Sequence, residues 1–162
     1  MKKIPLTQGK YALVDDEDFE ELSKHKWQYN KSLRTGYAQR SSPWVDYDHP
    51  RHAIMMHREI LGAQDGVEVD HINLNGLDNR RANLRTCPHN LNVCNSPKRR
   101  GACSSRFKGV SWAKPMKAWR ARIQFEKRAF FLGYFDREEE AALAYNLAAK
   151  ECRGDFAYLN EI

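Results

Sequence analysis

Residues 69 to 95, VDHINLNGLDNRRANLRTCPHNLNVCN, are unusually rich in asparagine, and this stretch limits the local fold more than any other. The β-branched residues of VEVDHI and NLRTC favour strands, and the turn-forming residues of NLNGLDNRRAN predict a loop between them. Proline is tolerated in the first turn of a helix, so we expect a helix to begin at Pro88 and include HNLNVCN. The stretch therefore predicts a β-hairpin followed directly by a helix.

That hairpin and helix would gather side chains suited to binding a metal ion. Asp70 offers a carboxylate oxygen, and His71 offers an imidazole that titrates near neutral pH. Asn92 and Asn95 would be neighbours on one helix face, with His89 one turn before Asn92. Oxygen ligands suit Mg²⁺ or Mn²⁺ better than zinc, so we expect one of these ions and no structural zinc. Whether Asn92, Asn95 or His89 completes the metal shell stays open at this point.

The basic residues are concentrated in the C-terminal part of the chain. The net charge is +6, yet residues 1 to 96 hold 13 basic and 13 acidic side chains. Residues 97 to 128 hold 11 basic side chains and the single acid Glu126. Because aromatic residues are interleaved with these charges, the pattern favours a folded surface that binds a polyanion over a disordered tail.

Other features of the composition exclude several classes of protein. No apolar run is long enough to span a membrane, and 41% apolar residues are enough for modest cores. The opening MKKIPLTQGK lacks the apolar segment of a secretory signal, which predicts a cytoplasmic protein. The cysteines form no C-x-x-C pair, so neither a zinc knuckle nor a disulfide framework is expected. They are Cys87, Cys94, Cys103 and Cys152.

The remaining patterns predict an α+β protein with two domains. In the first, YALVD, KWQYN, TGYAQRS and HAIMMH (52 to 57) indicate short strands of a small mixed sheet. DDEDFEELSKHKW indicates a short helix, and a second helical turn should stop at Gly62. Residues 97 to 105 form a basic linker rich in Ser, Pro and Gly. We therefore expect domains at 1 to 96 and 106 to 162, with the hairpin and helix at about 66 to 96.

Strict alternation in WRARIQF predicts a strand with one apolar and one cationic face. Turns at 114 to 117 and 126 to 127 would make it part of a three-stranded antiparallel sheet. Asp136 fits a helix N-cap that forms a capping box with Glu139, and Gly154 would end this helix. A stripe of mostly small side chains would pack the helix on the apolar face of the sheet. These are Ala142, Tyr145, Ala149 and Cys152.

Residues 54 to 95 resemble the HNH endonucleases. The residues that carry the likeness are Asp70-His71, Asn79-Arg80, Asn83-Leu84-Arg85, Asn92 and Asn95. The resemblance implies a ββα-metal site that cleaves DNA phosphodiesters with one divalent cation. Such cleavage needs an activated nucleophile and stabilisation of charge on the phosphate and the leaving oxygen, which one imidazole and one Mg²⁺ ion supply together.

The same resemblance assigns roles to the matched positions. His71 would be the general base that removes a proton from the attacking water. Asp70 and Asn92 would ligate the metal, and Asn83 would brace the loop so that His71 points correctly. Three arginines would clamp flanking phosphates, and three further residues are alternative ligands or supports. The arginines are Arg80, Arg81 and Arg85, and the alternatives are Asn95, His89 and His57.

Residues 106 to 160 resemble the APETALA2-type DNA-binding domain of plant ethylene-response factors, which also occurs in phage and bacterial homing endonucleases. The matching segments are GVSW, WRARI, FLGYF, EEAALAYNLAA and GDFAYLN. The resemblance implies that the sheet enters the major groove of DNA. The implied DNA contacts are Trp112, Arg120, Arg122 and Gln124, with Lys108, Lys114 and Arg128 on phosphates. The residues expected in the core instead are Trp119, Phe131 and Tyr145.

Together these features predict a site-specific, homing-type HNH endonuclease that acts on double-stranded DNA, by nicking or by double-strand cleavage. We expect a monomer or weak dimer in the cytoplasm of a bacterial or phage-infected cell, with no small-molecule cofactor and no membrane partner. The alternative from another class is a non-catalytic, sequence-specific DNA-binding regulator in which a degenerate nuclease domain survives as a scaffold.

Overall fold

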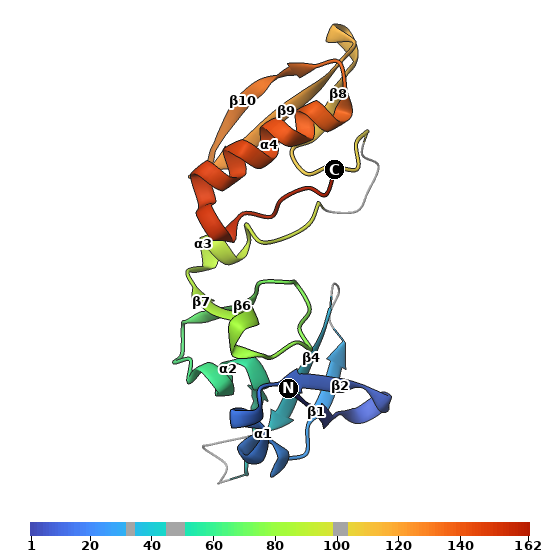
Figure 1. Ribbon diagram of the computed structural model, residues 1–162. Helices are drawn as coiled ribbons and strands as arrows, with labels where there is room; N and C mark the ends of the chain where they lie inside the picture. Colours follow the sequence, from blue (N-terminus) through green and yellow to red (C-terminus); the bar gives the residue numbers. More distant parts are fainter. Residues whose placement is uncertain (32–34, 45–50, 99–103) are drawn as a thin grey trace. The chain divides into compact units, whose positions relative to one another are not determined.

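The computed structural model describes residues 1–31, 35–44, 51–98 and 104–162 (Figure 1). They form two compact units, Met1–Asn92 and Val93–Ile162. Each unit combines helices with small antiparallel sheets, so the predicted α+β class is confirmed. Residues 99 to 103 of the expected linker, with Arg99, Arg100 and Cys103, lie outside the described residues. In the described parts of the chain, no helix is long and apolar enough to cross a membrane.

The N-terminal unit begins with two small sheets and two helices. Strands β1 and β2 pair antiparallel, and β3, β4 and β5 form a second antiparallel sheet in that order. Helix α2 begins at Met56, so the prediction of strand through His57 is wrong, because the chain turns into helix directly after Met55. The bounds are β1 (Lys2–Pro5), β2 (Tyr11–Val14), α1 (Asp16–Ser23), β3 (Gln28–Lys31), β4 (Gly36–Ser41), β5 (Ala53–Met55) and α2 (Met56–Leu61).

A single apolar core joins these elements. It consists of Ile4, Leu6, Ala12, Val14, Leu22, Trp27, Ala38, Met56, Ile60 and Leu84. Two arginines form hydrogen bonds around α2. Arg40 donates two hydrogen bonds of 3.0 Å to Glu59 and so links β4 to α2. Arg58 donates to backbone carbonyls of the segment between α2 and the next strand, which orders the approach to that strand.

The asparagine-rich stretch forms the predicted hairpin, with a shorter helix than expected. Its elements are β6 (Glu68–His71), the 3-10 turn η2 (Arg81–Asn83), β7 (Leu84–Cys87) and α3 (His89–Asn92). Strands β6 and β7 pair antiparallel, as predicted. Helix α3 has only four residues. Asn95 therefore lies beyond the helix, and the prediction that Asn92 and Asn95 share a helix face is wrong.

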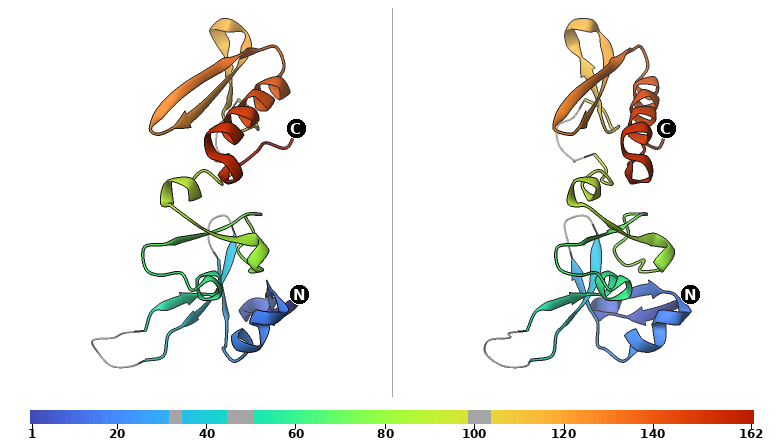
Figure 2. Two further views of the ribbon diagram at one scale, coloured as in Figure 1. Left: turned by 60° about the vertical axis from the view of Figure 1, so that its left-hand side comes forward. Right: turned by 90° about the vertical axis from the view of Figure 1, so that its left-hand side faces the viewer.

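The C-terminal unit is a three-stranded antiparallel sheet, in the order β10-β9-β8, with helix α4 packed against it (Figure 2). The bounds are β8 (Val110–Ala113), β9 (Ala118–Phe125), β10 (Arg128–Phe135) and α4 (Glu138–Arg153). The predicted sheet and both turns are confirmed. The predicted N-cap is wrong: the cap residue is Arg137, not Asp136, and no side chain bonds the helix start. Gly154 ends the helix, as predicted.

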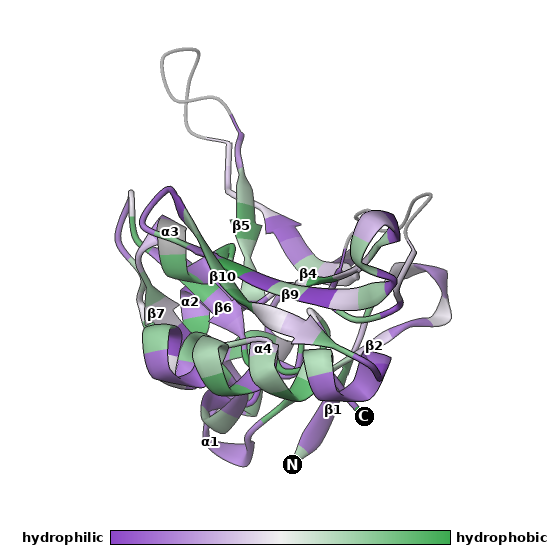
Figure 3. Cartoon of the chain, turned by 90° about the horizontal axis from the view of Figure 1, so that it is seen from above, coloured by the Kyte–Doolittle hydropathy of each residue, from purple (hydrophilic) through white to green (hydrophobic). Residues whose placement is uncertain are grey.

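Alternating side chains divide the C-terminal sheet into a covered and an open face. Hydrophilic positions recur along β9 (Figure 3), and its buried Ala121 and Ile123 face α4, whose small residues allow close packing. A register shift between Phe131 and Gly133 interrupts the alternation in β10. Phe131 lies before this shift, opposite the exposed Arg122, so its side chain is on the open face and 59% exposed, and the prediction that it lies in the core is wrong. Tyr145 is buried and Trp119 packs partly against the core, as predicted.

Gly109 provides a direct test of the packing between α4 and the sheet. Its φ is +79°, and a Cβ there would lie 2.0 Å from the Tyr145 ring and 2.7 Å from the Arg122 carbonyl oxygen. We expect Gly109→Ala to lower the free energy of unfolding by about 3 kcal/mol or more, because backbone strain and overpacking add. Gly62→Ala is the matched control, since φ is +58° and ψ is +34° with no atom within 4 Å of the added carbon, and should cost about 1 kcal/mol. Equal losses in the free energy of unfolding for the two variants, measured by urea unfolding, would contradict this packing.

Candidate active site

The β6–β7 hairpin carries the two residues that define the site. Asp70 pairs with Arg85 across the hairpin, and His71 pairs with Leu84. Successive side chains of a strand point to opposite faces, so Asp70 and His71 leave β6 on different sides. Both side chains are buried, each residue being 5% exposed. A buried carboxylate and a buried imidazole need polar partners, and the structure provides them for both.

His71 lies against two aromatic rings and one buried amide. Its Nε2 lies 3.3 Å from Oδ1 of Asn79, which is fully buried. Ring centroids of Tyr37 and His57 lie 5.8 and 5.0 Å from that of His71. An amide oxygen only accepts hydrogen bonds, so this contact favours the tautomer with the proton on Nε2 and the lone pair on Nδ1.

The surroundings of the two histidines favour their neutral forms. Burial lowers the pKa of His71 below its ordinary value, although the hydrogen bond that His71 donates to Asn79 and the charges of Asp70 and Asp78 partly offset this. Burial, with smaller effects of His71 and Arg58, lowers the pKa of His57 from 6.5 to about 3. His57 Nδ1 is buried and has no hydrogen-bond partner among the described residues. Both rings are therefore uncharged at neutral pH, and His71 is in the form that accepts a proton.

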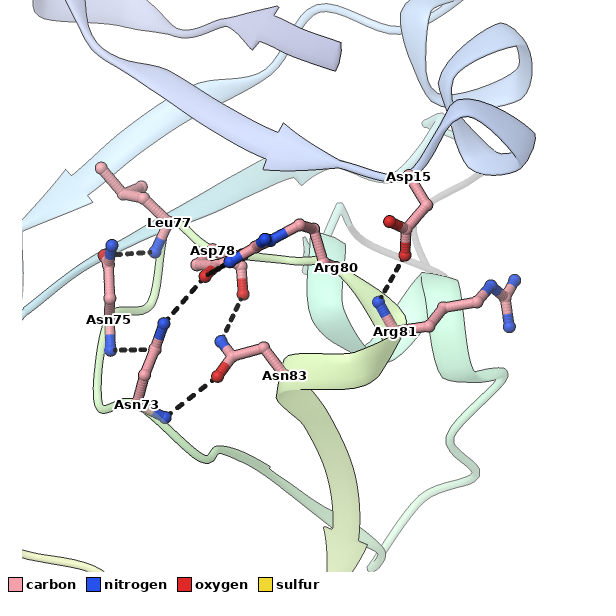
Figure 4. A network of polar contacts seen from close by, with 8 residues as sticks. All are labelled: Asp15, Asn73, Asn75, Leu77, Asp78, Arg80, Arg81 and Asn83. Carbon is pink, nitrogen blue, oxygen red and sulfur yellow. Dashed lines mark hydrogen bonds and ion pairs between the residues drawn. The ribbon is translucent and has the colours of Figure 1, made fainter. Parts of the chain in front are cut away.

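A network of side-chain hydrogen bonds holds the hairpin loop in shape (Figure 4). Asn83 donates to the carbonyl of Asp78 (2.7 Å) and accepts from the backbone N–H of Asn73 (3.0 Å), so it spans the loop. Asn73 also donates to the Asp78 carboxylate at 2.8 Å. The side chains of Asn73 and Asn75 each accept a backbone N–H two residues on, as in Asx-turns. The loop conformation thus depends on asparagine side chains.

The three arginines of this segment all take part in ion pairs. Arg80 bonds Asp78 at 2.7 and 2.6 Å, and Arg81 bonds Asp18 of α1 at 2.9 and 2.6 Å. Arg85 donates from Nε and Nη2 to Oδ2 of Asp70, at 2.9 and 2.6 Å. A phosphate clamp by these residues stays a prediction, and it would have to share or replace these carboxylate partners.

Helix α3 is attached to the hairpin through Glu68. Asn92 donates from Nδ2 to Glu68 Oε2 at 2.6 Å, and His89 Nδ1 lies 2.6 Å from Oε1 of the same carboxylate. The hydrogen bond from Asn92, followed by that from His89, lowers the pKa of Glu68. Asn95 is buried outside the helix. The helix residues named as alternative ligands therefore have different surroundings.

The chemistry of the donors fits a hard divalent cation. Asp70 supplies a carboxylate, and the Asn92 amide donates through its nitrogen, which leaves its oxygen end as the group for a cation. Within the described ranges, no three His, Cys, Asp or Glu side chains gather to hold a metal ion. A site with one carboxylate, one amide oxygen and water molecules as ligands does not need three such side chains. Its oxygen ligands suit Mg²⁺ or Mn²⁺.

The open face of the C-terminal sheet is cationic and aromatic. Cross-strand pairing sets Arg122 opposite Phe131 and Arg120 opposite Tyr134. The exposed rings of Phe131 and Tyr134 have centroids 4.9 Å apart. Gln124 is also exposed on this face, as alternation along β9 requires. The face thus presents guanidinium groups beside unburied aromatic surface, which is the composition of many nucleic-acid-binding surfaces.

The other predicted DNA contacts of this unit do not share that face. Trp112 pairs with Trp119 across the sheet, with ring centroids 5.1 Å apart, so it lies on the side of α4. The Lys108 ammonium donates to the carbonyls of Cys94 (2.9 Å) and Ser96 (2.6 Å) and so serves the internal structure. Lys114 and Arg128 are exposed at the turns. DNA contacts by these four residues stay predictions.

Comparison with known proteins identifies the family. No protein-family model matches the chain. A protein of Acanthamoeba polyphaga mimivirus, named as an uncharacterized HNH endonuclease, is 31% identical over 160 residues, which are 95% of this chain and 76% of the viral protein. The chain belongs to the HNH endonucleases. The predicted HNH resemblance is thereby confirmed, and the relationship extends over both units; the APETALA2-like nature of the second stays a prediction.

Two polar residues around the HNH site, Tyr37 and Glu68, were not singled out from the sequence. Asn79 was singled out as part of the Asn79-Arg80 motif, and in the structure it is the fully buried partner of His71. Tyr37 reaches His71 from β4, and Glu68 holds the ends of α3. A sequence signal exists only for Asn79, which is part of the Asn79-Arg80 motif. Tyr37 is brought near by the tertiary fold, which local pattern does not reveal.

The neutral state of His57 makes stability depend on pH. Because the folded-state pKa of about 3 lies below the ordinary 6.5, the unfolded chain binds the proton first as pH falls. The stabilisation from a neutral His57 is fully present above pH 6.5 and is lost as the pH falls from 6.5 to about 3. We expect His57 alone to lower the free energy of unfolding by roughly 3 kcal/mol between pH 7 and pH 4. Urea unfolding at several pH values should show a flatter dependence for His57→Phe, with exposed His52→Phe as control. An unchanged slope in His57→Phe would contradict a neutral His57.

Proposed function

We propose that this HNH endonuclease hydrolyses DNA phosphodiester bonds as a homing-type enzyme, with His71 as general base and one divalent metal ion. The observation that carries the proposal is the buried imidazole of His71, which desolvation keeps neutral and Asn79 orients. His71 directly follows Asp70, whose carboxylate is also buried. A general base needs both an available lone pair and a fixed direction at neutral pH. The neutral ring and its contact with Asn79 support this role.

The chain's own groups account for the handling of the proton. With Nε2 donating to Asn79, the proton from the attacking water would pass to Nδ1 of His71. The charges of Asp70 and Asp78 raise the pKa of His71 against the effect of burial, and so stabilise the imidazolium that forms. Asn83 keeps the loop closed behind this pair through its bonds to Asn73 and Asp78. The base is thus fixed by neighbours that do not themselves react.

Asp70 and Asn92 would hold the metal ion, because they offer a carboxylate and an amide oxygen to a hard cation. When bound, Mg²⁺ or Mn²⁺ supplies Lewis-acid stabilisation of negative charge on the phosphate and the leaving oxygen. Arg85, bonded to Asp70, adds a fixed positive charge beside that carboxylate. It thereby limits the cost of burying the carboxylate before any cation arrives.

The C-terminal unit would bind the target DNA through its open face, in the manner of the APETALA2-type domain it resembles. Support comes from the guanidinium groups of Arg120 and Arg122 and from the exposed rings of Phe131 and Tyr134 on that face. Arginine forks suit guanine edges and phosphates, and exposed rings suit sugar and base surfaces. The substrate proposed on these grounds is double-stranded DNA.

Replacement of the general base tests the catalytic part of this proposal. His71→Ala should lower Mg²⁺-dependent cleavage of supercoiled plasmid by about 100-fold or more, because water then lacks a proton acceptor. Affinity for DNA should stay near that of the unmodified protein. His52→Ala, at an exposed histidine of the same unit, should cleave normally. Full activity of His71→Ala would remove His71 from the mechanism, and DNA binding without any cleavage by the unmodified protein would favour the non-catalytic regulator.

The open face is tested by DNA binding of the second unit. A fragment from Val93 to Ile162 is suitable, because Lys98 donates to the carbonyls of Ser105, Phe107 and Val110 and so belongs to this unit. Its affinity for duplex DNA should fall steeply with salt.

Within that fragment, Arg122→Ala should weaken binding to a preferred site by roughly 1 to 3 kcal/mol if the guanidinium reads a guanine. Lys150→Ala, at an exposed lysine of α4, is the matched control and should bind like the unmodified fragment. Salt-independent binding, or equal losses for the two variants, would contradict recognition by this face.

A further inference from the structure

Helix α3 is too short to hold its own position. It has four residues, and helices shorter than about 12 residues are marginal in water without tertiary contacts. Its backbone bonds from Leu91 and Asn92 return only to the carbonyl of Pro88. The orientation of the Asn92 side chain therefore depends on what α3 contacts on β6.

Glu68 of β6 contacts both ends of this helix. Its Oε1 lies 2.6 Å from Nδ1 of His89, the first helical residue, and its Oε2 accepts a 2.6 Å hydrogen bond from Nδ2 of Asn92, the last. The two oxygens of one carboxylate thus fix two points one turn apart. The His89 ring is mostly exposed, whereas Glu68 and Asn92 are partly buried. The bond to Asn92 is therefore the better shielded of the two.

The chemistry of the two groups determines which way the amide of Asn92 points. A carboxylate only accepts hydrogen bonds, so the amino end of the amide must face Glu68 and the oxygen end must face away. Glu68 and Asp70 are two residues apart on β6, and their side chains leave the strand on the same face. The Asn92 amide is consequently held on the face of β6 that also carries Asp70.

We propose that Glu68 is a positioning residue of the metal site, which acts by turning the oxygen of Asn92, rather than its nitrogen, toward the cation. The inference rests on the proposed function, since it takes Asp70 and Asn92 as the ligands. It also favours Asn92 among the helix residues, because the ring of His89 is mostly exposed and Asn95 lies outside the helix. Partners that orient ligands in this way commonly change metal affinity 10- to 100-fold when removed.

The test is a titration of the full-length protein with Mn²⁺, without DNA, followed by electron paramagnetic resonance of the free ion. Glu68→Ala should weaken Mn²⁺ binding tenfold or more, because the amide is then free to rotate. Glu68→Gln keeps an acceptor oxygen for the Asn92 amino group and should stay within about threefold of the unmodified protein. Glu20→Ala, at an exposed glutamate of α1, is the matched control and should bind normally.

Each outcome has a distinct meaning. Normal Mn²⁺ binding by Glu68→Ala would overturn the positioning role and leave the proposed function intact. Equal losses in Glu68→Ala and Glu68→Gln would overturn it in favour of Glu68 as a direct ligand. Failure of the unmodified protein to bind Mn²⁺ or to cleave DNA would overturn the proposed function, and this inference with it.

A second readout does not involve the metal. In the metal-free protein, nuclear magnetic resonance should show the side-chain NH₂ group of Asn92 with a downfield, slowly exchanging proton that is lost in Glu68→Ala. An Asn92 amide that already resembles that of an exposed asparagine in the unmodified protein would overturn the proposal, whatever the stability of the variants.

Discussion

The site depends on a single constraint, the docking of an irregular loop onto strand β2. The backbone N–H of Leu13 donates to the carbonyl of Leu77 at 2.8 Å, and the N–H of Asn79 donates to the carbonyl of Leu13 at 2.8 Å. These two bonds place Asn79 beneath His71, and Asn73 and Asn83 complete the loop from within. Without the docking, the imidazole would have no fixed partner, so the N-terminal sheet is as necessary to the site as the hairpin itself.

The arginines of the HNH site and those of the open face have different surroundings. In the N-terminal unit, Arg80, Arg81 and Arg85 are each bonded to a carboxylate, which links the loop and the hairpin to one another and to α1. In the C-terminal unit, Arg122 projects from the open face of the sheet. This contrast agrees with the charge distribution of the sequence, in which the first 96 residues are balanced and the excess lies beyond them. We therefore propose that the second unit contributes most of the binding to a polyanion.

Local sequence patterns predicted many of the strands and helix ends, because the spacing of apolar residues and the presence of turn-forming residues are local properties. The alternation in β9, the turn glycines Gly62 and Gly154, and the β6–β7 hairpin were all found in this way. The failures have non-local causes. The pairing of β10 with β9 sets Phe131 opposite Arg122 on the open face, and α3 ends at Asn92, where the pattern predicted a longer helix. The carboxylate partners of Arg81, Arg85 and Asn92 lie between 15 and 64 residues away, and no local signal reveals them.

The central claim is that His71 is a neutral base with its proton on Nε2, held by Asn79. The most direct measurement is the ¹⁵N resonance of both ring nitrogens of His71, assigned in the full-length protein at pH 7. The account predicts a protonated Nε2, an unprotonated Nδ1, and no conversion to imidazolium until the pH falls below the ordinary histidine pKa of about 6.5. An imidazolium at pH 7, or a neutral ring with its proton on Nδ1, would contradict it.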